Sequence, residues 1–238
     1  ATTVLVSGNF DTRTISKKIQ NAFASIPRSA KAKKRPVVEP QNRPKMLLKY
    51  KKTDQAHVSL GVRSFKGKHK MSAALKVLDA VLGGGMSSRL FQRIREEMGV
   101  GYYLRTTIDE YTDHGYFSVS LGLDSSRFVE VVKAILDECK KLTTDLISKT
   151  ELVKAKEYLI GNTILSLESS DAMAEYFAIQ DITGEEITTP EGLIRKIRKV
   201  TREDVRTIAE EIFTNDRLVL SAVGPVKEST ALKKAFRF

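Results

Sequence analysis

The sequence predicts an α+β protein, with helices packed on one face of a largely antiparallel mixed sheet. Stretches in which apolar and polar residues alternate, typical of half-buried strands, fill much of the first half of the chain. A long block with helical periodicity follows, and one apolar strand comes after it. Strands, then helices, then a closing strand are typical of a sheet whose helices lie together on one side.

The first predicted elements are a strand at residues 2–8 and a helix at residues 11–25. Asp11 has the side chain of a helix N-cap, and Pro27 stops the helix. This opening therefore predicts one complete strand and helix.

Two further strands are predicted, KMLLKYKK at 45–52 and QAHVSLGVRSF at 55–65, and we expect them to pair in one sheet. The second strand places His57, Ser59 and Gly61 on one face. Its other face is apolar and consists of Val58, Leu60 and Val62.

A helix is predicted at residues 70–82, ending at Gly83–Gly85, where further helix is costly. A second helix, SSRLFQRIREEM, follows with Ser87 as its cap and Gly99 as its end. Its apolar stripe fits helical spacing and consists of Leu90, Phe91, Ile94 and Met98.

A hairpin is predicted from strands at 100–111 and 115–123, the second with one buried face. That face consists of Phe117, Val119, Leu121 and Leu123. Helices are then expected at 126–143, 148–168, 169–182, 190–199 and 201–213. Thr201 and the acidic residues after it favour the start of the last one. A strand at 217–223 and a short tail helix complete the prediction.

The two ends of the chain resemble each other. Gly8 and Gly224 both end an apolar strand and lie 224 − 8 = 216 residues apart. The pair Lys17-Lys18 precedes the pair Lys233-Lys234 by the same number of residues. An internal repeat of this kind indicates that the fold is built from homologous units. We expect one complete unit preceded by the last strand and helix of another. The predicted divisions are 1–26, a closing strand and helix; 27–45, a basic linker; and 46–238, the main domain.

The net charge of +11 is concentrated in one segment. Residues 28–52 hold ten Lys or Arg and one Glu, a charge of 10 − 1 = +9, which leaves +2 elsewhere. A charge run with prolines is typical of a solvated linker. No aromatic interleaving or recognition-helix pattern supports a nucleic-acid partner. Binding to nucleic acid or an anionic surface stays an alternative, which steep salt dependence would reveal.

No apolar run approaches the length needed to span a bilayer, and no signal peptide is visible, so no membrane partner is expected. Cys139 is the one cysteine, which excludes an internal disulfide and favours a reducing compartment. We expect a cytoplasmic location, although a disulfide-free organellar or periplasmic chain would look the same. The chain begins inside a predicted strand without a methionine, so we expect it to be truncated.

Motifs for independent catalysis are absent from the sequence. His57, His69 and His114 stand apart, and no H-x-x-E-H, H-E-x-x-H or other ligand spacing occurs. There is no G-x-S-x-G elbow and no phosphate-binding glycine loop. We therefore expect no metal site in this chain and no activity of the chain alone.

The stretch LGGGMSSRLFQRIREEMGVGYYL is distinctive, and it resembles the pitrilysin/insulinase-type zinc peptidases. Five further segments share this resemblance: QAHVSLGVRSF, ELVKAKEYLIGNTILSLESS, AMAEYF, VTREDV and LVLSAVGP. This inverzincin family includes the mitochondrial processing peptidases and the core proteins of the bc1 complex. Its members have two homologous α+β halves that face each other around a chamber, like a clam shell. The N-terminal half usually carries H-x-x-E-H, whereas this chain resembles the C-terminal half. The resemblance implies zinc in the complete enzyme and none bound by this chain.

The resemblance also implies catalytic positions. In catalytic members an Arg and a Tyr, seven residues apart after the S-R-L-[FY] run, assist hydrolysis from the C-terminal half, and the matching residues are Arg95 and Tyr102. Gly99 and Gly101 allow the sharp turn that lets Tyr102 open the next strand. A guanidinium and a phenol can both donate to a developing oxyanion.

Structural interpretations stay open for each of these residues. Arg95 also reads as an exposed helix arginine pairing with Glu96, Glu97 or Asp79, and Tyr102 as a half-buried strand aromatic. The predicted substrate-binding residues are Gly83, Gly84, Gly85 and Tyr103. The glycines also read as a plain helix break. An extended peptide could pair as an added strand with residues beginning near Tyr103 to Leu104, or with residues 56–62, which we expect to form an edge strand.

The resulting expectation is the C-terminal, non-zinc-binding half of a zinc metalloendopeptidase, which shapes the chamber, binds peptide and assists hydrolysis. The alternative is a non-catalytic structural or partner subunit of the same fold, like the core proteins. The expected partners are a zinc-bearing N-terminal half, on the same or a separate chain, and a peptide or unfolded polypeptide. A homodimer is a further expectation.

Overall fold

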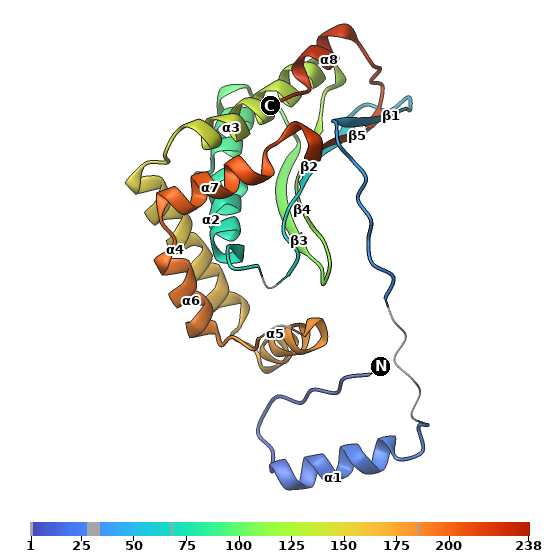
Figure 1. Cartoon of the computed structure of the whole chain (residues 1–238), viewed down its shortest axis with the longest axis vertical. Helices are drawn as coiled ribbons and strands as arrows, with labels where there is room; N and C mark the ends of the chain where they lie inside the picture. The colour runs from blue at the N-terminus through green and yellow to red at the C-terminus, as the bar shows by residue number, and fades with distance from the viewer. Residues whose placement is uncertain (1, 28–33, 68, 185) are drawn as a thin grey trace.

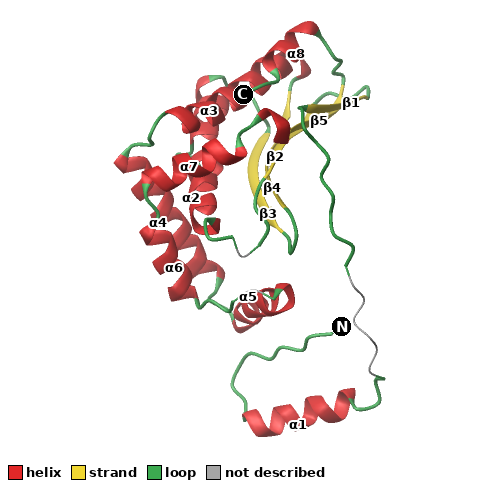
Figure 2. Cartoon of the chain, in the orientation of Figure 1, coloured by secondary structure: helices red, strands yellow, loops and turns green. Residues whose placement is uncertain are grey.

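The computed structural model describes residues 2–27, 34–67, 69–184 and 186–238. These residues form one five-stranded sheet with helices on one side of it (Figures 1 and 2). The predicted fold class, a mixed and largely antiparallel sheet with helices on one face, is confirmed.

The strands of the sheet follow the predicted segments. They are β1 (Lys45–Tyr50), β2 (Ala56–Arg63), β3 (Tyr103–Glu110), β4 (Gly115–Leu123) and β5 (Leu218–Gly224). Their order across the sheet is β1-β5-β2-β4-β3, so β1 and β3 form its two edges. β1 runs parallel to β5, and the other three pairs are antiparallel.

The expectation that β1 and β2 pair directly is wrong, because β5 lies between them. Their burial explains the arrangement. Every second residue of β2 and of β5 is buried, whereas no residue of β1 is buried. Strands with a fully buried face are stabilised inside a sheet, and a lysine-bearing strand is tolerated at an edge.

The helices that cover the sheet agree with the predicted ranges to within a few residues. They are α2 (Ser72–Gly83), α3 (Phe128–Thr144), α4 (Lys149–Ser166), α5 (Ser170–Thr183), α6 (Pro190–Lys199), α7 (Arg202–Ile212) and α8 (Thr230–Ala235). In Figure 1, α5 lies beyond the end of the helical layer, below the tip of β3 and β4.

The hydrophobic core lies between this layer and the sheet. The predicted inward face of β4 is confirmed, since its four apolar residues are at most 1% exposed: Phe117, Val119, Leu121 and Leu123. Burial of such side chains contributes about 1.5–3 kcal/mol each. From α2, Leu75 and Leu78 fill the core, and from α3, Ile135 and Leu142 do so.

Side-chain caps fix where the later helices begin. Ser148 starts α4 in a capping box with Glu151, and Thr201 starts α7 in another with Asp204, as predicted for α7. Each box satisfies backbone N–H groups that the first turn leaves without a partner. The helices therefore begin where the sequence places their caps.

The helix after the glycines differs from the expectation. Residues Phe91–Glu97 form a π-helix, in which Met98 N donates to Arg93 O at 3.2 Å. The cap predicted at Ser87 is wrong, because Leu90 precedes the π-helix and no side chain caps it. Arg89 and Leu90 lead into it with helical geometry, and Gln92 N donates to Ser88 O. The wider turn accommodates one extra residue per turn and often marks a functional region.

The N-terminal segment has a helix but no strand. α1 (Thr12–Phe23) is capped by Asp11, as predicted, and none of its residues is buried. Residues 2–8 form no strand, because the described part of the chain gives them no partner strand. In Figure 1 the segment lies apart from the sheet, below α5. The predicted division at residues 1–26 stays a prediction.

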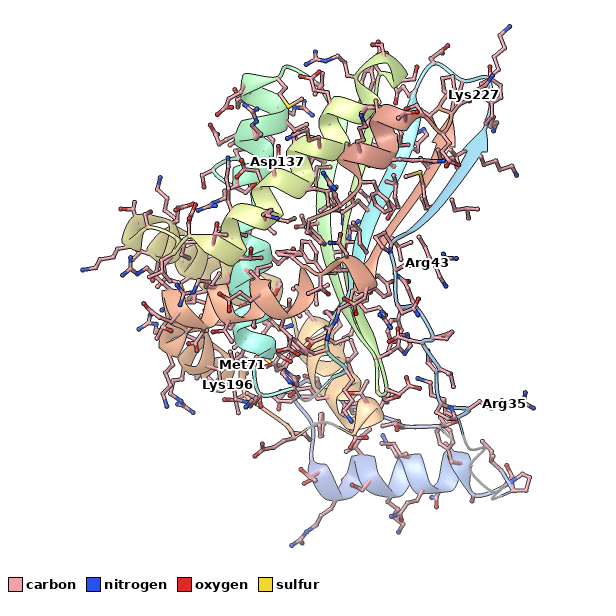
Figure 3. The ribbon with its side chains drawn as sticks, turned by 45° about the horizontal axis from the view of Figure 1, so that its top comes forward. Arg35, Arg43, Met71, Asp137, Lys196 and Lys227 are labelled. Atoms are coloured by element: carbon pink, nitrogen blue, oxygen red, sulfur yellow. The ribbon has the colours of Figure 1, made fainter. Side chains whose placement is uncertain are left out.

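The predicted linker at 27–45 is partly tied to the domain, and its residues 28–33 lie outside the described residues. Lys34 Nζ is 2.5 Å from Asp113 Oδ1, and Val37 N donates to Asp113 Oδ2 at 3.1 Å. Arg63 Nη2 donates to Gln41 O at 3.0 Å. Figure 3 shows Arg35 and Arg43 along this extended segment, at the side of the domain.

Within the described ranges, no helix is long and apolar enough to cross a membrane.

Candidate functional site

Arg95 lies on the π-helix, and its side chain turns back onto the chain that leads into β3. Arg95 Nη1 donates to Tyr102 O at 2.9 Å and to Gly101 O at 3.3 Å. Its Cζ lies 6.0 Å from the centroid of the Phe91 ring. The expected ion pairs of Arg95 with Glu96, Glu97 or Asp79 are not formed; Arg93 instead pairs with Glu97 at 2.6 Å.

Tyr102 stands directly before β3, and its backbone N donates to Gly122 O at 2.8 Å. Gly99 and Gly101 precede it with φ of 63° and 96°, a backbone region that favours glycine. The predicted turn through these glycines is therefore confirmed. The Tyr102 side chain is 61% exposed, and its hydroxyl bonds to no described residue. The half-buried interpretation of Tyr102 is wrong.

The structure thus brings the Arg95 guanidinium onto the backbone of Tyr102 and leaves the phenol directed to solvent. The guanidinium is a planar fork of donors, and both carbonyls lie on one side of it. Its remaining donors and the phenol hydroxyl can donate to a bound carbonyl or carboxylate.

Tyr103 is half exposed, and its hydroxyl lies 3.2 Å from His57 Nδ1 on β2. Its ring lies over Gly122, where a Cβ would come within 2.7 Å of the ring. Glycine at 122 therefore gives Tyr103 its position on the sheet. Residues 56–62 belong to the central β2, so the expectation of an edge there is wrong, whereas β3 is an edge.

The glycines at 83–85 each have a local structural reason, and the predicted helix break is confirmed. A Cβ on Gly83 would lie 2.2 Å from Thr106 Oγ1, and one on Gly84 would lie 2.6 Å from Ala80 Cα. Gly85 has a φ of 83°. The close approach of α2 to β3 at Thr106 requires glycine, and contact of these glycines with substrate stays a prediction.

Asp79 is a partly buried acidic residue that was not predicted as a site residue. Burial raises the pKa of its carboxyl, against the opposing effects of the Thr106 hydroxyl and the Lys76 charge. It lies on α2 beside β3. A signal was available in the sequence, since Asp79 interrupts the apolar run of AALKVLDAVL.

The fit of the chain to a zinc ion can be tested on its donor groups. Among the described residues, no three His, Cys, Asp or Glu are grouped so that they could hold a metal ion. His57 faces Tyr103, His69 stacks on Phe65 at 3.9 Å, and His114 Nδ1 lies 2.8 Å from Asp113 Oδ1. These residues do not fit a zinc site. Burial raises the pKa of the Cys139 thiol, which makes it a poor ligand.

A groove of about 770 Å³ lies between α2, the end of β3, α5 and α6. Its apolar lining includes Met71, Ile108, Ile179 and Leu193, and lysines stand along it. Figure 3 shows the labelled Met71 and Lys196 at the same end of the helical layer. The sequence analysis did not predict this groove, because it is formed by elements far apart in the chain.

The fold and these positions are those of a peptidase-related domain. The sequence profile of the family described as "Peptidase M16 inactive domain" matches residues 1–159. The chain belongs to this family, the pitrilysin-type zinc peptidases, and corresponds to their C-terminal half.

Relatives among known proteins agree with this assignment. The chain is 30% identical over 237 residues to an uncharacterized zinc protease of Streptomyces coelicolor, covering 96% of this chain and 51% of that protein. It is 30% identical over 222 residues to the uncharacterized zinc protease YmxG of Bacillus subtilis, covering 93% and 53%. The chain therefore spans about half the length of the curated relatives it matches.

Solved structures show the same fold. A protease from Helicobacter pylori superposes with a TM-score of 0.78 at 22% identity, covering 92% of this chain and 54% of that one. A peptidase M16 inactive domain from Pseudomonas fluorescens superposes with a TM-score of 0.79 at 20% identity, covering 92% and 53%.

Proposed function

We propose that this chain is the non-zinc-binding half of a zinc metalloendopeptidase, and that it binds peptide and assists hydrolysis with Arg95 and Tyr102. The observation that carries the proposal is the exposed phenol of Tyr102, a residue whose backbone carbonyl accepts from the Arg95 guanidinium. A tyrosine that is 61% exposed contributes little to a core, so a loss of activity on its replacement would not follow from a loss of stability.

We assign hydrogen-bond donation to these two groups. The Arg95 guanidinium orients the peptide by binding a carbonyl or carboxylate oxygen, and the Tyr102 hydroxyl donates to the oxyanion that forms during hydrolysis. Because the described residues do not fit a zinc ion, we assign the zinc to the other half of the enzyme. The names of the relatives as zinc proteases support a metal in the complete enzyme.

We further propose that residues 1–26 are the closing strand and helix of that other half, that 27–45 connect the halves, and that 46–238 form the C-terminal domain. The resemblance between this segment and β5 with α8 supports the division. β5 lies inside its sheet, between β1 and β2, which suggests that residues 2–8 need an equivalent place in a homologous sheet.

A non-catalytic partner subunit of the same fold is the second candidate. The contacts of Arg95 favour it, since a guanidinium that binds two carbonyls also braces the start of β3 in a scaffold. For the peptidase, we propose an extended or unfolded polypeptide as the substrate. We propose the N-terminal half as the partner and a homodimer as a further assembly. A cytoplasmic location remains part of the proposal.

The two candidates differ in the composition of the native protein. An immunoblot against this chain, with mass-spectrometric sequencing of its upstream region and of co-purifying chains, distinguishes them. A product of about twice this mass, or a partner chain, that carries H-x-x-E-H supports the peptidase. Absence of that motif from both would support the non-catalytic subunit. The chain purified alone is expected to bind less than one zinc per molecule, measured by atomic emission.

A further inference from the structure

The edge of β3 carries backbone groups without partners. Tyr111 N donates to His114 O across the turn, so Tyr111 and His114 form a hydrogen-bonded pair. Hydrogen-bonded pairs then recur at every second residue of β3, counted back from Tyr111. Arg105, Thr107 and Asp109 face β4 in these pairs. The backbone N–H and C=O groups of the alternating residues point away from the sheet: Leu104, Thr106 and Ile108. No hydrogen bond in the described ranges reaches these groups.

This edge has few of the features by which proteins usually block strand addition. β3 contains no lysine and no proline, and its charged residues are Arg105, Asp109 and Glu110. Of the residues whose backbone points outward, Leu104, Thr106 and Ile108 are uncharged, and their side chains turn to the helical face on the same side as Leu121, Val119 and Phe117. Glu110, at the end of the strand, also points its backbone outward, and its carboxylate is bound by Ser72 and Lys76. The edge is therefore open to pairing with another extended chain.

The edge connects the candidate site to the groove. β3 begins directly after Tyr102, and Ile108 and Glu110 at its other end line the groove of about 770 Å³. The eight residues of β3 extend roughly 26 Å at about 3.3 Å per residue. An added strand of similar length therefore reaches from Arg95 and Tyr102 to the groove.

The groove has a surplus of positive charge. Three lysines that line it form no ion pair with a described carboxylate: Lys70, Lys196 and Lys199. The Glu110 carboxylate is held by Ser72 Oγ at 2.5 Å and Lys76 Nζ at 3.4 Å, and Asp204 accepts from Thr201 N at 2.8 Å. Among the described residues, Glu186 is the remaining acidic residue that lines the groove. The surplus suits an acidic side chain beside apolar ones.

We propose that the edge of β3 is a docking strand for an extended peptide, with an acidic side chain of that peptide bound in the lysine-lined groove. The proposal rests on the proposed function, since it names how the same substrate class is held. Main-chain hydrogen bonds to Leu104, Thr106 and Ile108 supply affinity for any extended sequence. The groove adds a preference at one position.

Hydrogen exchange followed by NMR on the full chain tests the docking strand. The probe is a decapeptide of alternating valine and threonine with two glutamates at one end. Without peptide, we expect fast exchange of the Leu104, Thr106 and Ile108 amides and slow exchange of Arg105 and Thr107. Saturating peptide is expected to slow the first group at least tenfold and leave the second unchanged.

Two modified probes and two variants sharpen the test. N-methylation of the peptide on its pairing edge is expected to weaken binding about tenfold or more, and methylation on the other edge to have no effect. Lys196→Glu is expected to weaken binding about threefold, measured by fluorescence anisotropy. Lys140→Glu, an exposed lysine on α3, is the matched control and is expected to bind like the wild type.

The outcomes separate this proposal from the proposed function. Absence of protection, or equal protection of all β3 amides, overturns the docking strand. Protection that appears without peptide and rises with protein concentration also overturns it, because a second copy then occupies the edge. If β3 is protected by peptide but Arg95 and Tyr102 variants of the assembled enzyme keep full turnover, the assignment of those two residues fails and the docking strand stands.

Discussion

The two edges of the sheet differ in what protects them. β1 carries Lys45 and Lys49, and two further lysines follow it directly, so a chain that approached this edge would meet several positive charges. Leu47 is 70% exposed between them, an apolar side chain that lies among charges. Lys227 lies 5.3 Å from the centroid of the Tyr50 ring at the end of the strand.

β3 carries no lysine, and four of the candidate site residues lie at its start or contact it. Tyr102 and Arg95 stand at its start, and Tyr103 is its first residue. Gly83 allows α2 to pack against Thr106 in its middle. In our proposal, the lysines keep β1 free of partners, and β3, which has none, receives the peptide.

The largest expected effect concerns the start of β3. Arg95→Ala removes the guanidinium that donates to Gly101 O and Tyr102 O, and with it the donors assigned to the peptide. We expect kcat of the assembled enzyme to fall by about 10²–10³, as for the loss of an oxyanion donor. Steady-state kinetics measures it.

The control for this prediction is Arg93→Ala, which removes an exposed ion pair on the same helix. It is expected to leave kcat within about twofold of the wild-type value. Equal loss of turnover in both variants would mean that the π-helix as a whole, and not Arg95, supports activity.

The next largest effect concerns the contact between α2 and β3. Gly83→Ala places a Cβ 2.2 Å from Thr106 Oγ1, so the strand or the helix must shift. We expect the free energy of unfolding to fall by about 1–3 kcal/mol, measured by urea denaturation. Gly161→Ala, in the open interior of α4, is the control and is expected to raise it by about 0.5–1 kcal/mol. A stable Gly83→Ala variant would show that β3 is not held by this contact.

A smaller effect concerns the turn between β3 and β4. Asp113 accepts from Lys34, His114 and Val37, and these bonds hold the pKa of its carboxyl well below the ordinary value of 3.8. Because the pKa of Asp113 is lower in the folded than in the unfolded protein, its ionised carboxylate stabilises the contact with the 34–37 segment above the unfolded pKa. This stabilisation is lost as the pH falls through the folded pKa. We expect the Val37 amide to stay protected from exchange down to below pH 3.8.

Asp113→Ala is expected to remove the protection of Val37 at neutral pH. Asp137→Ala, which removes an exposed pair on α3, is the control and is expected to leave it unchanged. If Val37 lost its protection between pH 5 and 4, Asp113 would not be the group that holds the extended segment.

The smallest effect concerns the protected edge. Lys45→Val with Lys49→Val is expected to change stability by less than about 0.5 kcal/mol, because both side chains are on the surface. The double variant is expected to self-associate, since an uncharged edge strand can pair with a copy. Light scattering against protein concentration measures it. A double variant that stays monomeric would mean that the lysines do not protect β1.

Local signals predicted most of the elements of the fold. Asp11 and Thr201 cap the helices that their sequence context predicts, and the alternating residues from Phe117 to Leu123 are buried. Each of these follows from chemistry within a few residues. The position of β5 between β1 and β2 does not follow from local chemistry. It depends on which strands bury a full face when the sheet assembles.

The site could be predicted only in part. The resemblance supplied Arg95 and Tyr102, and Gly99 and Gly101 predicted the turn between them. The direction of the guanidinium was not predictable, since its carbonyl partners are positioned by the π-helix and the turn together. The groove at Ile108 needs helices from the end of the chain, so its residues carry no shared sequence pattern.

Turnover of Tyr102→Phe in the assembled enzyme, measured beside its thermal unfolding midpoint, tests whether the phenol takes part in hydrolysis. The substitution removes one hydroxyl that bonds to no described residue and is exposed, so the unfolding midpoint should stay within about 1 °C of the wild type. If the Tyr102 hydroxyl donates to the oxyanion, kcat should fall by about tenfold or more, with KM changed little. Unchanged kcat, or a loss of turnover that follows a loss of stability, would contradict the assignment of Tyr102.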